Sequence, residues 1–162
     1  DRCSRSESTD TAGPATAALL RDGLKAHVFA TEILPDQRDL ISQRLRHYCD
    51  GHSIDLVVTA GGTGFAPCDV TPEATRDVVE RFAPGLDEAM RAASLTKSQH
   101  AMLSRGASGI RGSTLIINLP GSQRAALENL SVVLPALPHA LAALRGEVMD
   151  CGRPTQARVC RE

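Results

Sequence analysis

The sequence predicts an α/β fold of three layers, in which helices cover both faces of a mostly parallel sheet. Short apolar runs rich in Val, Ile and Leu alternate along the chain with segments of helical periodicity. Such alternation requires crossover connections, which place helices on both faces of the sheet. Two of the apolar runs also end in glycine-rich segments, at residues 61–64 and 120–122. Ligands of these folds bind at the carboxyl ends of the strands, so a site is expected there.

The size and composition of the chain fit one globular domain. It has 162 residues, of which 42% are hydrophobic but only 2% are aromatic. The core must therefore consist of Leu, Val, Ile and Ala rather than of aromatic rings. Residues 147–162 are polar and lack periodicity. We assign residues 1–146 to a single domain and residues 147–162 to a tail or linker.

The first half of the chain predicts a helix, a strand and a second helix. Pro14 is placed to open a helix over residues 15–25, because proline is favoured at the first helical position. Residues 27–34 alternate well enough between apolar and polar types to predict a strand. Ile41, Leu45 and Tyr48 then form one apolar stripe of a helix that ends near Gly51.

The second half of the chain repeats this alternation. An apolar run at 54–59 predicts a strand, and Thr71 as N-cap with Pro72 predicts a helix from 72 to 81. A helix over 85–94 precedes an irregular stretch that continues to residue 105. Arg111-Gly112 predicts a turn before a second buried strand at 114–119. Helices over 124–134 and 138–145 complete the domain.

Charge and cysteine usage favour a small-molecule ligand in the cytoplasm. The formal net charge is -1 and no block of like charges occurs, so neither a nucleic-acid partner nor a polybasic membrane patch is expected. The five cysteines are irregularly spaced without a CxxC pair, which is typical of a reducing compartment. The apolar runs fall short of the about 20 residues that a membrane helix needs. The sequence thus predicts no membrane span.

The segment Gly61-Gly62-Thr63-Gly64 is the first candidate for binding chemistry. Glycines allow backbone N–H groups to approach an anion that side chains would otherwise block. The segment is not a Walker A loop, because no Gly-Lys-Ser/Thr follows it. Taken alone, it fits an anion-binding loop and an ordinary structural turn about equally well.

Two carboxylates add to this candidate site. Asp69 lies just before a predicted helix, where it would either cap the helix or hold a cation against phosphate. Asp36 follows another predicted strand and would converge on the same place. Two carboxylates are what Mg²⁺ commonly takes from a protein. Arg105 fits a phosphate clamp or an ordinary surface charge, and both interpretations stay open.

At this point the residues resemble a known family. The run at 59–75, TAGGTGFAPCDVTPEAT, closely resembles the signature of molybdopterin adenylyltransferases, including the G domains of gephyrin and its plant relatives. AMLSR at 101–105, GIRG at 109–112, LIINLPGS at 115–122 and LPALPHA at 134–140 resemble further blocks of that family in the same order. The resemblance extends from residue 1 to about residue 145.

The resemblance implies an α/β fold, a homotrimer and a role in molybdenum cofactor biosynthesis. The implied reaction is Mg²⁺-dependent transfer of AMP from ATP to molybdopterin, with release of pyrophosphate. Asp36 and Asp69 match the family's catalytic, Mg²⁺-associated carboxylates, and Ser104 matches a serine associated with the pterin. The residues that match substrate- and nucleotide-binding positions are Gly61, Gly62, Thr63, Gly64, Thr71, Ser104, Arg105, Asn118, Pro120, Gly121 and Ser122. A molybdenum-insertion domain, fused or separate, is a further implied partner.

The sequence departs from the family pattern at two places. Cys68 stands where relatives usually carry Arg, so one positive charge near the phosphates is missing. The strand that usually leads into Ser-Asp is also absent, because the sequence starts at Asp1-Arg2-Cys3-Ser4. Two other functions remain open: a non-catalytic trimeric scaffold of the gephyrin type, and a nucleotide pyrophosphatase of the related competence-damage family.

Overall fold

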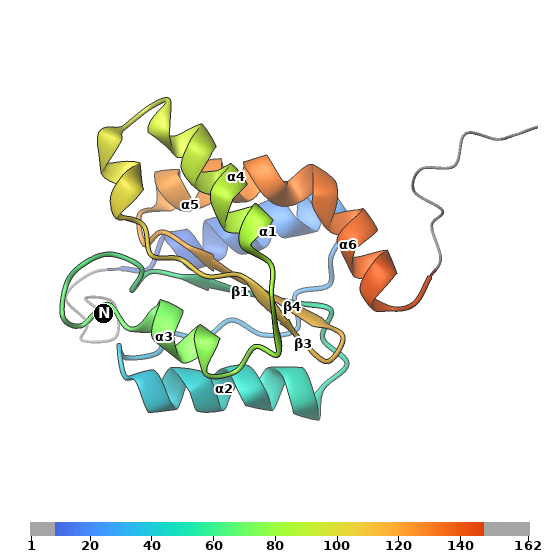
Figure 1. The fold of residues 1–162 in the computed structure, drawn as a ribbon. Coiled ribbons are helices and arrows are strands. Elements are labelled where there is room, and N and C mark those ends of the chain that lie inside the picture. The colour runs from blue at the N-terminus through green and yellow to red at the C-terminus, as the bar shows by residue number, and fades with distance from the viewer. Residues whose placement is uncertain (1–8, 148–162) are drawn as a thin grey trace, which may run out of the picture.

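The computed structural model describes residues 9–147 as a mixed sheet with helices on both faces (Figure 1). This confirms the predicted α/β class. The helices are α1 (Ala12–Leu24), α2 (Arg38–Gly51), α3 (Thr71–Arg76), α4 (Pro84–Leu95), α5 (Gln123–Val133) and α6 (Leu137–Leu144), with two 3-10 helices, η1 (Gln99–Leu103) and η2 (Leu134–Ala136). The strands are β1 (Leu56–Ala60), β2 (Arg81–Phe82), β3 (Gly109–Arg111) and β4 (Thr114–Leu119).

The sheet has the strand order β1-β4-β3-β2. β1 pairs with β4 in parallel, whereas β3 is antiparallel to both β4 and β2. Within residues 9–147 the sheet is therefore mixed rather than mostly parallel. Two short strands that the sequence pattern did not predict, β2 and β3, form its antiparallel edge. Gly112, with φ of 55°, makes the predicted turn from β3 into β4.

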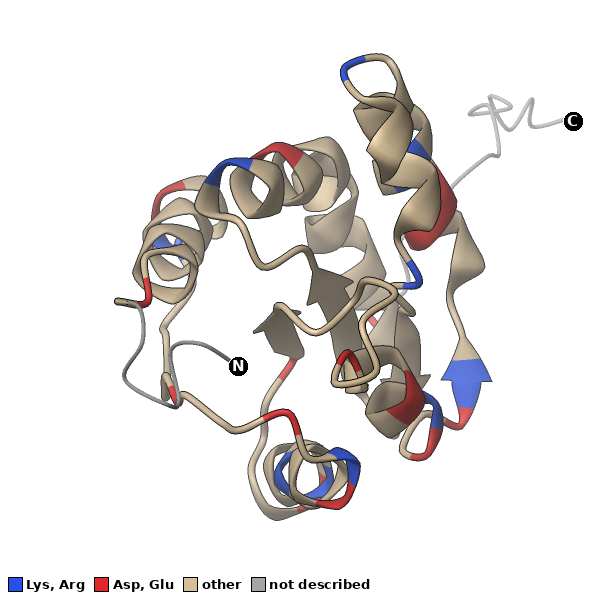
Figure 2. Ribbon diagram, turned by 90° about the vertical axis from the view of Figure 1, so that its left-hand side faces the viewer, with Lys and Arg blue, Asp and Glu red and all other residues tan. Residues whose placement is uncertain are grey.

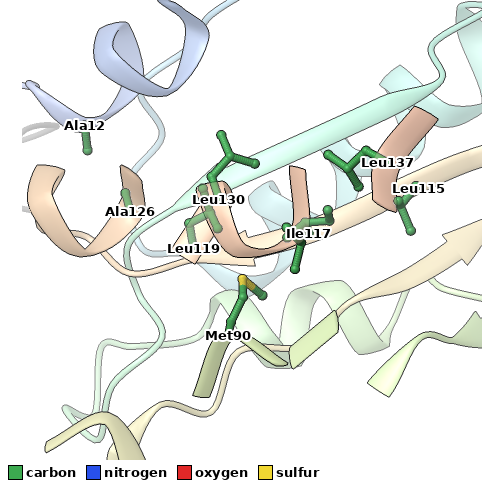
Figure 3. Packing of buried hydrophobic residues seen from close by; sticks show 9 residues of the cluster. Ala12, Met90, Leu115, Ile117, Leu119, Ala126, Leu130 and Leu137 are labelled. Atoms are coloured by element: carbon green, nitrogen blue, oxygen red, sulfur yellow. The ribbon is translucent and has the colours of Figure 1, made fainter. Parts of the chain in front are cut away.

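Helices on both faces of the sheet bury an aliphatic core. All six residues of β4 are buried, as expected for a strand that is covered on both faces. Leu115, Ile117 and Leu119 belong to one cluster, which α1, α4 and α5 cover (Figure 3). Ile116 points the opposite way and packs with Ile41 and other residues from the layer of α2 and α3. The predicted aliphatic core is thus present.

The predicted strand over residues 27–34 is wrong. The structure has neither helix nor strand between α1 and α2, although the segment holds several apolar residues. A strand requires a neighbour to pair with, and within residues 9–147 β1 has β4 as its sole partner. A groove of about 1370 Å³ is lined by both residues 26–34 and β1. Phe29 and Ile33 are each left 55% exposed.

The helix predicted over residues 72–81 is shorter than expected. It ends at Arg76, and Glu80 N then donates to Ile110 O at 2.8 Å. Pairing with β3 therefore replaces the last helical turn. The helix also begins at Thr71, after Val70 as N-cap, and has no side-chain cap. The prediction of Thr71 as N-cap is thus wrong. The other predicted helices begin and end within about three residues of α1, α2, α4, α5 and α6.

The helical run Gln123–Leu144 is long and apolar enough, by length and composition alone, to cross a membrane. A core helix of a globular domain passes the same test. The run comprises α5, η2 and α6, and Leu130, Val133 and Leu137 within it belong to the buried core. One face of the run therefore packs on the core of the domain. The predicted tail, apart from residue 147, lies outside the described residues.

Candidate active site

The two glycine-rich loops meet at the carboxyl ends of the parallel strands. Gly61 and Gly62 follow β1 with φ of 108° and 62°, a region that favours glycine. Gly61 N donates to Leu119 O, the last residue of β4, at 3.0 Å. A Cβ on Gly121 would lie 3.2 Å from Gly61 Cα, so the loops pack backbone to backbone. This is the edge of the sheet where ligands of α/β folds bind.

Both predicted carboxylates lie against the first loop. A Cβ on Gly62 would lie 3.3 Å from Asp36 Oδ1 and 2.3 Å from Thr71 Oγ1. A Cβ on Gly64 would lie 2.8 Å from Asp69 Oδ2. At Gly62 a side chain would in addition be strained by the φ of 62°. Asp36 and Asp69 come from different segments of the chain, and both line the groove.

Asp69 stabilises a turn rather than a helix. Its Oδ2 accepts from Ala66 N at 2.9 Å, and Asp69 N donates to Ala66 O at 2.8 Å. The alternative that Asp69 caps the following helix is therefore not what the structure shows, since α3 has no side-chain cap. An ionised carboxylate has about four acceptor positions. One N–H partner leaves capacity on the Asp69 side chain for a cation.

Arg105 makes its contacts within the protein. Its Nε donates to Gly64 O at 2.6 Å, Nη1 donates to Glu73 Oε1 at 2.6 Å, and Nη2 donates to Asp69 O at 2.5 Å. Arg105 N also donates to Thr63 O at 2.9 Å. Every nitrogen of the guanidinium thus has a protein oxygen as partner. Arg105 is neither an isolated surface charge nor turned toward the groove.

Asn118 is also turned into the protein. It is 2% exposed, and its Nδ2 donates to Thr59 Oγ1 and Thr75 Oγ1, each at 2.9 Å. Its Oδ1 accepts from Ala107 N at 3.1 Å. These partners use both N–H groups of the side chain. Asn118 joins β4 to β1 and α3.

The remaining predicted residues divide between the groove and its surroundings. Gly61, Gly62, Thr71, Gly121 and Ser122 line the groove together with the two carboxylates. Ser122 Oγ accepts from Ala125 N at 3.2 Å and so caps α5. The groove lining does not include the other predicted residues, namely Thr63, Gly64, Ser104, Arg105, Asn118 and Pro120. Ser104 is partly buried directly after η1.

Sequence reasoning did not single out two acidic side chains with buried oxygens, Glu73 and Asp87. Glu73 lies in the first turn of α3, and its Oε2 is buried without a hydrogen-bond partner. Asp87 is 5% exposed and accepts from Ser108 N and Ser108 Oγ, at 2.7 and 2.8 Å. Burial raises the pKa of Asp87, although the hydrogen bonds from Ser108 lower it in part. In the sequence alone, each of them is an ordinary acidic residue of a first helical turn.

Asp36 and Asp69 are the candidate cation ligands of the groove. Figure 2 shows Lys and Arg interspersed with Asp and Glu over the drawn part of the chain. Residues 9–147 contain no group of three or more His, Cys, Asp or Glu that could hold a metal ion by themselves. A cation at Asp36 and Asp69 would therefore need further oxygen ligands from water or substrate, as is usual for Mg²⁺.

Comparison with known proteins identifies the family. The family model described as "Probable molybdopterin binding domain" matches residues 1–139. The chain belongs to this family. It is 41% identical over 159 residues to the molybdenum cofactor synthesis protein cinnamon of Drosophila melanogaster, covering 98% of the chain and 26% of that protein. It is 43% identical over 151 residues to the molybdopterin adenylyltransferase of Helicobacter pylori strain J99, covering 93% of the chain and 86% of that enzyme.

Solved structures agree with this family assignment. The molybdopterin biosynthesis enzyme MoaB of Thermus thermophilus superposes with a TM-score of 0.84 at 48% identity, covering 90% of this chain and 91% of that one. The protein CinA of Thermoplasma acidophilum superposes with a TM-score of 0.55 at 17% identity. At that identity, the likeness to CinA concerns the fold alone. This member of the probable molybdopterin binding domain family thus has the family's α/β architecture.

Proposed function

We propose that this chain is a molybdopterin adenylyltransferase, which transfers AMP from ATP to molybdopterin in molybdenum cofactor biosynthesis. The observation that carries the proposal is the placement of Asp36 and Asp69 against Gly62 and Gly64 at the end of β1. Relatives with 35 to 43% identity that bear the name molybdopterin adenylyltransferase support the same activity.

The proposed reaction is an in-line substitution at phosphorus. An oxygen of the terminal phosphate of molybdopterin attacks the α-phosphorus of ATP. The bond from the α-phosphorus to the bridging oxygen of the β-phosphate breaks, and pyrophosphate leaves with that electron pair. A phosphate nucleophile needs no strong base, so positioning and charge neutralisation supply most of the catalysis. Backbone N–H groups of the Gly61–Gly64 loop are suited to hold anionic oxygens.

The residues present fit a Mg²⁺ ion. Asp36 and Asp69 would supply hard oxygen ligands of the kind that Mg²⁺ prefers, and both line the groove, where water or phosphate could supply the remaining ligands. When bound, Mg²⁺ neutralises charge on the phosphates. The two carboxylates would hold the ion, and Gly121 and Ser122 would border the substrate from the second loop.

Several further features of the family resemblance belong to the same proposal. Ser104 would contact the pterin, the active form would be a homotrimer in the cytoplasm, and a molybdenum-insertion domain, fused or separate, would receive the product. Support for a fused partner comes from the relatives: the chain covers 22% of the gephyrin of Dictyostelium discoideum and 45% of a bifunctional protein of Chlorobaculum tepidum.

One incubation tests the proposal against its two rivals. The chain is mixed with ATP, Mg²⁺ and molybdopterin, and products are separated by chromatography. An adenylyltransferase forms adenylyl-molybdopterin and pyrophosphate in equal amounts. A pyrophosphatase consumes ATP without adenylylated pterin, and a scaffold consumes neither substrate. Absence of the adenylylated pterin under these conditions would overturn the proposed function.

A further inference from the structure

One guanidinium holds the active-site loop at widely spaced points. Arg105 binds Gly64 O in the middle of the loop, Asp69 O at its end and the Glu73 side chain in α3. Its own backbone N–H binds Thr63 O. Arg105 follows η1 and lies at least 32 residues along the chain from each of these partners. The contacts therefore tie the loop to a distant part of the fold.

The geometry of the peptide unit gives these contacts a direction. In a trans peptide the C=O and the next residue's N–H point to opposite sides. Binding of Thr63 O and Gly64 O to Arg105 therefore turns the N–H groups of Gly64 and Phe65 away from Arg105. Backbone N–H groups aligned in this way are what an anion-binding loop requires. Asp69 O is held by the same guanidinium, which fixes the backbone that carries the Asp69 carboxylate.

We infer that Arg105 is a positioning residue, which shapes the loop 63–69 for phosphate and does not itself contact substrate. The planar fork of arginine can serve acceptors in several fixed directions, whereas the ammonium of lysine is a single point charge. The role thus depends on the shape of the guanidinium more than on its charge. The activity part of this inference rests on the proposed function, while its structural part does not.

Glu73 completes the arrangement from α3. Its Oε1 accepts from Arg105 Nη1 at 2.6 Å and from Arg76 Nη1 at 3.3 Å. Arg76 is the more exposed of the two arginines: 45% of its side chain is exposed, compared with 31% for Arg105. Arg76 also reaches Arg105 O at 3.3 Å but has no hydrogen bond to the loop 63–69. It is therefore a matched control that shares Glu73 with Arg105.

The test compares Arg105→Lys, Arg105→Gln and Arg76→Gln with the wild-type chain. Hydrogen exchange measures the amides of residues 63–69 and, as a global reference, those of β4. Steady-state kinetics measure KM for ATP and kcat separately. We expect both Arg105 variants to speed exchange in the loop by at least about tenfold while β4 is unchanged. KM for ATP should rise by about tenfold or more in both variants. Arg76→Gln should match the wild type in both measurements.

Three results would overturn the inference. Near-normal KM in Arg105→Lys together with a raised KM in Arg105→Gln would show that charge, and hence direct phosphate contact, is the role. Faster exchange in β4 as well as in the loop would show a general structural role. Unchanged loop exchange in both Arg105 variants would show that the contacts do not position the loop. A wild-type chain without adenylyl transfer would refute the proposed function, yet the exchange measurement would still decide the role of Arg105.

Discussion

Individual residues of the site are held by contacts that suggest specific substitutions. Cys68 is an exposed free thiol directly before Asp69, at the position where the family resemblance expects Arg. An arginine there would project from the same exposed turn that Asp69 Oδ2 stabilises through Ala66 N. Residue 68 directly precedes Asp69, which lines the groove.

We predict that Cys68→Arg lowers KM for ATP. A charge-assisted hydrogen bond to phosphate contributes about 1.5 to 3 kcal/mol, so the decrease should exceed about tenfold. Ala66→Arg places the same charge in the same exposed turn and serves as the control for charge alone. Steady-state kinetics at saturating molybdopterin provide the measurement. A KM that is unchanged or raised in Cys68→Arg would place residue 68 outside the site.

The raised pKa of Asp87 predicts that the stability of the protein depends on pH. Because burial raises the pKa of Asp87, the folded protein binds a proton at this carboxyl more tightly than the unfolded chain does. The free energy of unfolding should therefore fall as the pH rises from the ordinary range of Asp through the raised pKa. Asp87→Asn lacks this titration but keeps an acceptor for Ser108 N. We expect the variant to gain stability relative to the wild type as the pH rises from about 4 to about 7. Urea unfolding of both proteins measures this, and a difference independent of pH would contradict it.

At the scale of elements, the loop after β1 depends on glycine at one position above all. Gly62 combines a φ of 62° with the closest approach to Thr71 Oγ1, 2.3 Å from a built Cβ. We predict that Gly62→Ala displaces Asp36 or Thr71 and lowers turnover by more than about tenfold. The control is Gly85→Ala in α4, where a Cβ has nothing within 4 Å. Turnover equal to wild type in Gly62→Ala would show that the close packing is not needed.

The strands β1 and β4 should differ in local stability. β4 is buried at all six residues and pairs on both sides, whereas β1 pairs with β4 alone among residues 9–147. Backbone N–H groups at an unpaired edge exchange with solvent more readily. We expect the amides of β1 that point away from β4 to exchange faster than those of β4. Equal protection in the two strands would show that another segment covers the edge of β1 in solution.

The comparison of these elements shows what a sequence pattern can establish. The run at 114–119 became β4, and the burial of Leu115, Ile117 and Leu119 on one face follows from their hydrophobicity. The burial of Asn118 on the other face depends on its hydrogen bonds to Thr59 and Thr75. Residues 27–34 are predicted as a strand but form none, because strand pairing depends on a neighbour elsewhere in the chain. The 2-residue β2 and 3-residue β3 are too short for a periodic signal.

The candidate site also has features that the sequence predicts and features that it does not. Glycine-rich loops after predicted strands, and the aspartates near them, follow from local sequence and the general location of sites in α/β folds. The directions of the Arg105 and Asn118 side chains cannot be predicted from local sequence. They depend on acceptors far along the chain, such as Gly64 O and Thr75 Oγ1. Both residues belong to the site region, yet their contacts are with the protein itself.

At the scale of the whole molecule, the family resemblance predicts a homotrimer. Exposed apolar side chains such as Phe82, Met102 and Val132 leave surface for association, although scattered exposed residues are common in monomers as well. Sedimentation velocity at micromolar concentration tests the prediction. A mass three times the chain's 17.2 kDa is expected. A single monomeric species would contradict the quaternary expectation while leaving the fold and the site intact.

The central claim for the whole molecule is that Asp36 and Asp69 form one cation site for adenylyl transfer. Asn at residue 69 retains an oxygen for Ala66 N, so the turn and the melting temperature should be preserved. The charge that holds Mg²⁺ is lost. Asp36→Asn tests the second ligand, and the double variant should lose much less than the product of the two single effects, because both carboxylates would hold the same ion. Asp39→Asn, on an exposed neighbour of Asp36, is the matched control.

The most direct measurement is the kcat of Asp69→Asn for adenylyl-molybdopterin formation, recorded as a function of Mg²⁺ concentration beside the melting temperature. We predict that kcat falls by orders of magnitude, that the melting temperature hardly changes, and that Asp39→Asn behaves as wild type. Near-normal turnover in Asp69→Asn at ordinary Mg²⁺ concentrations would contradict the two-carboxylate site.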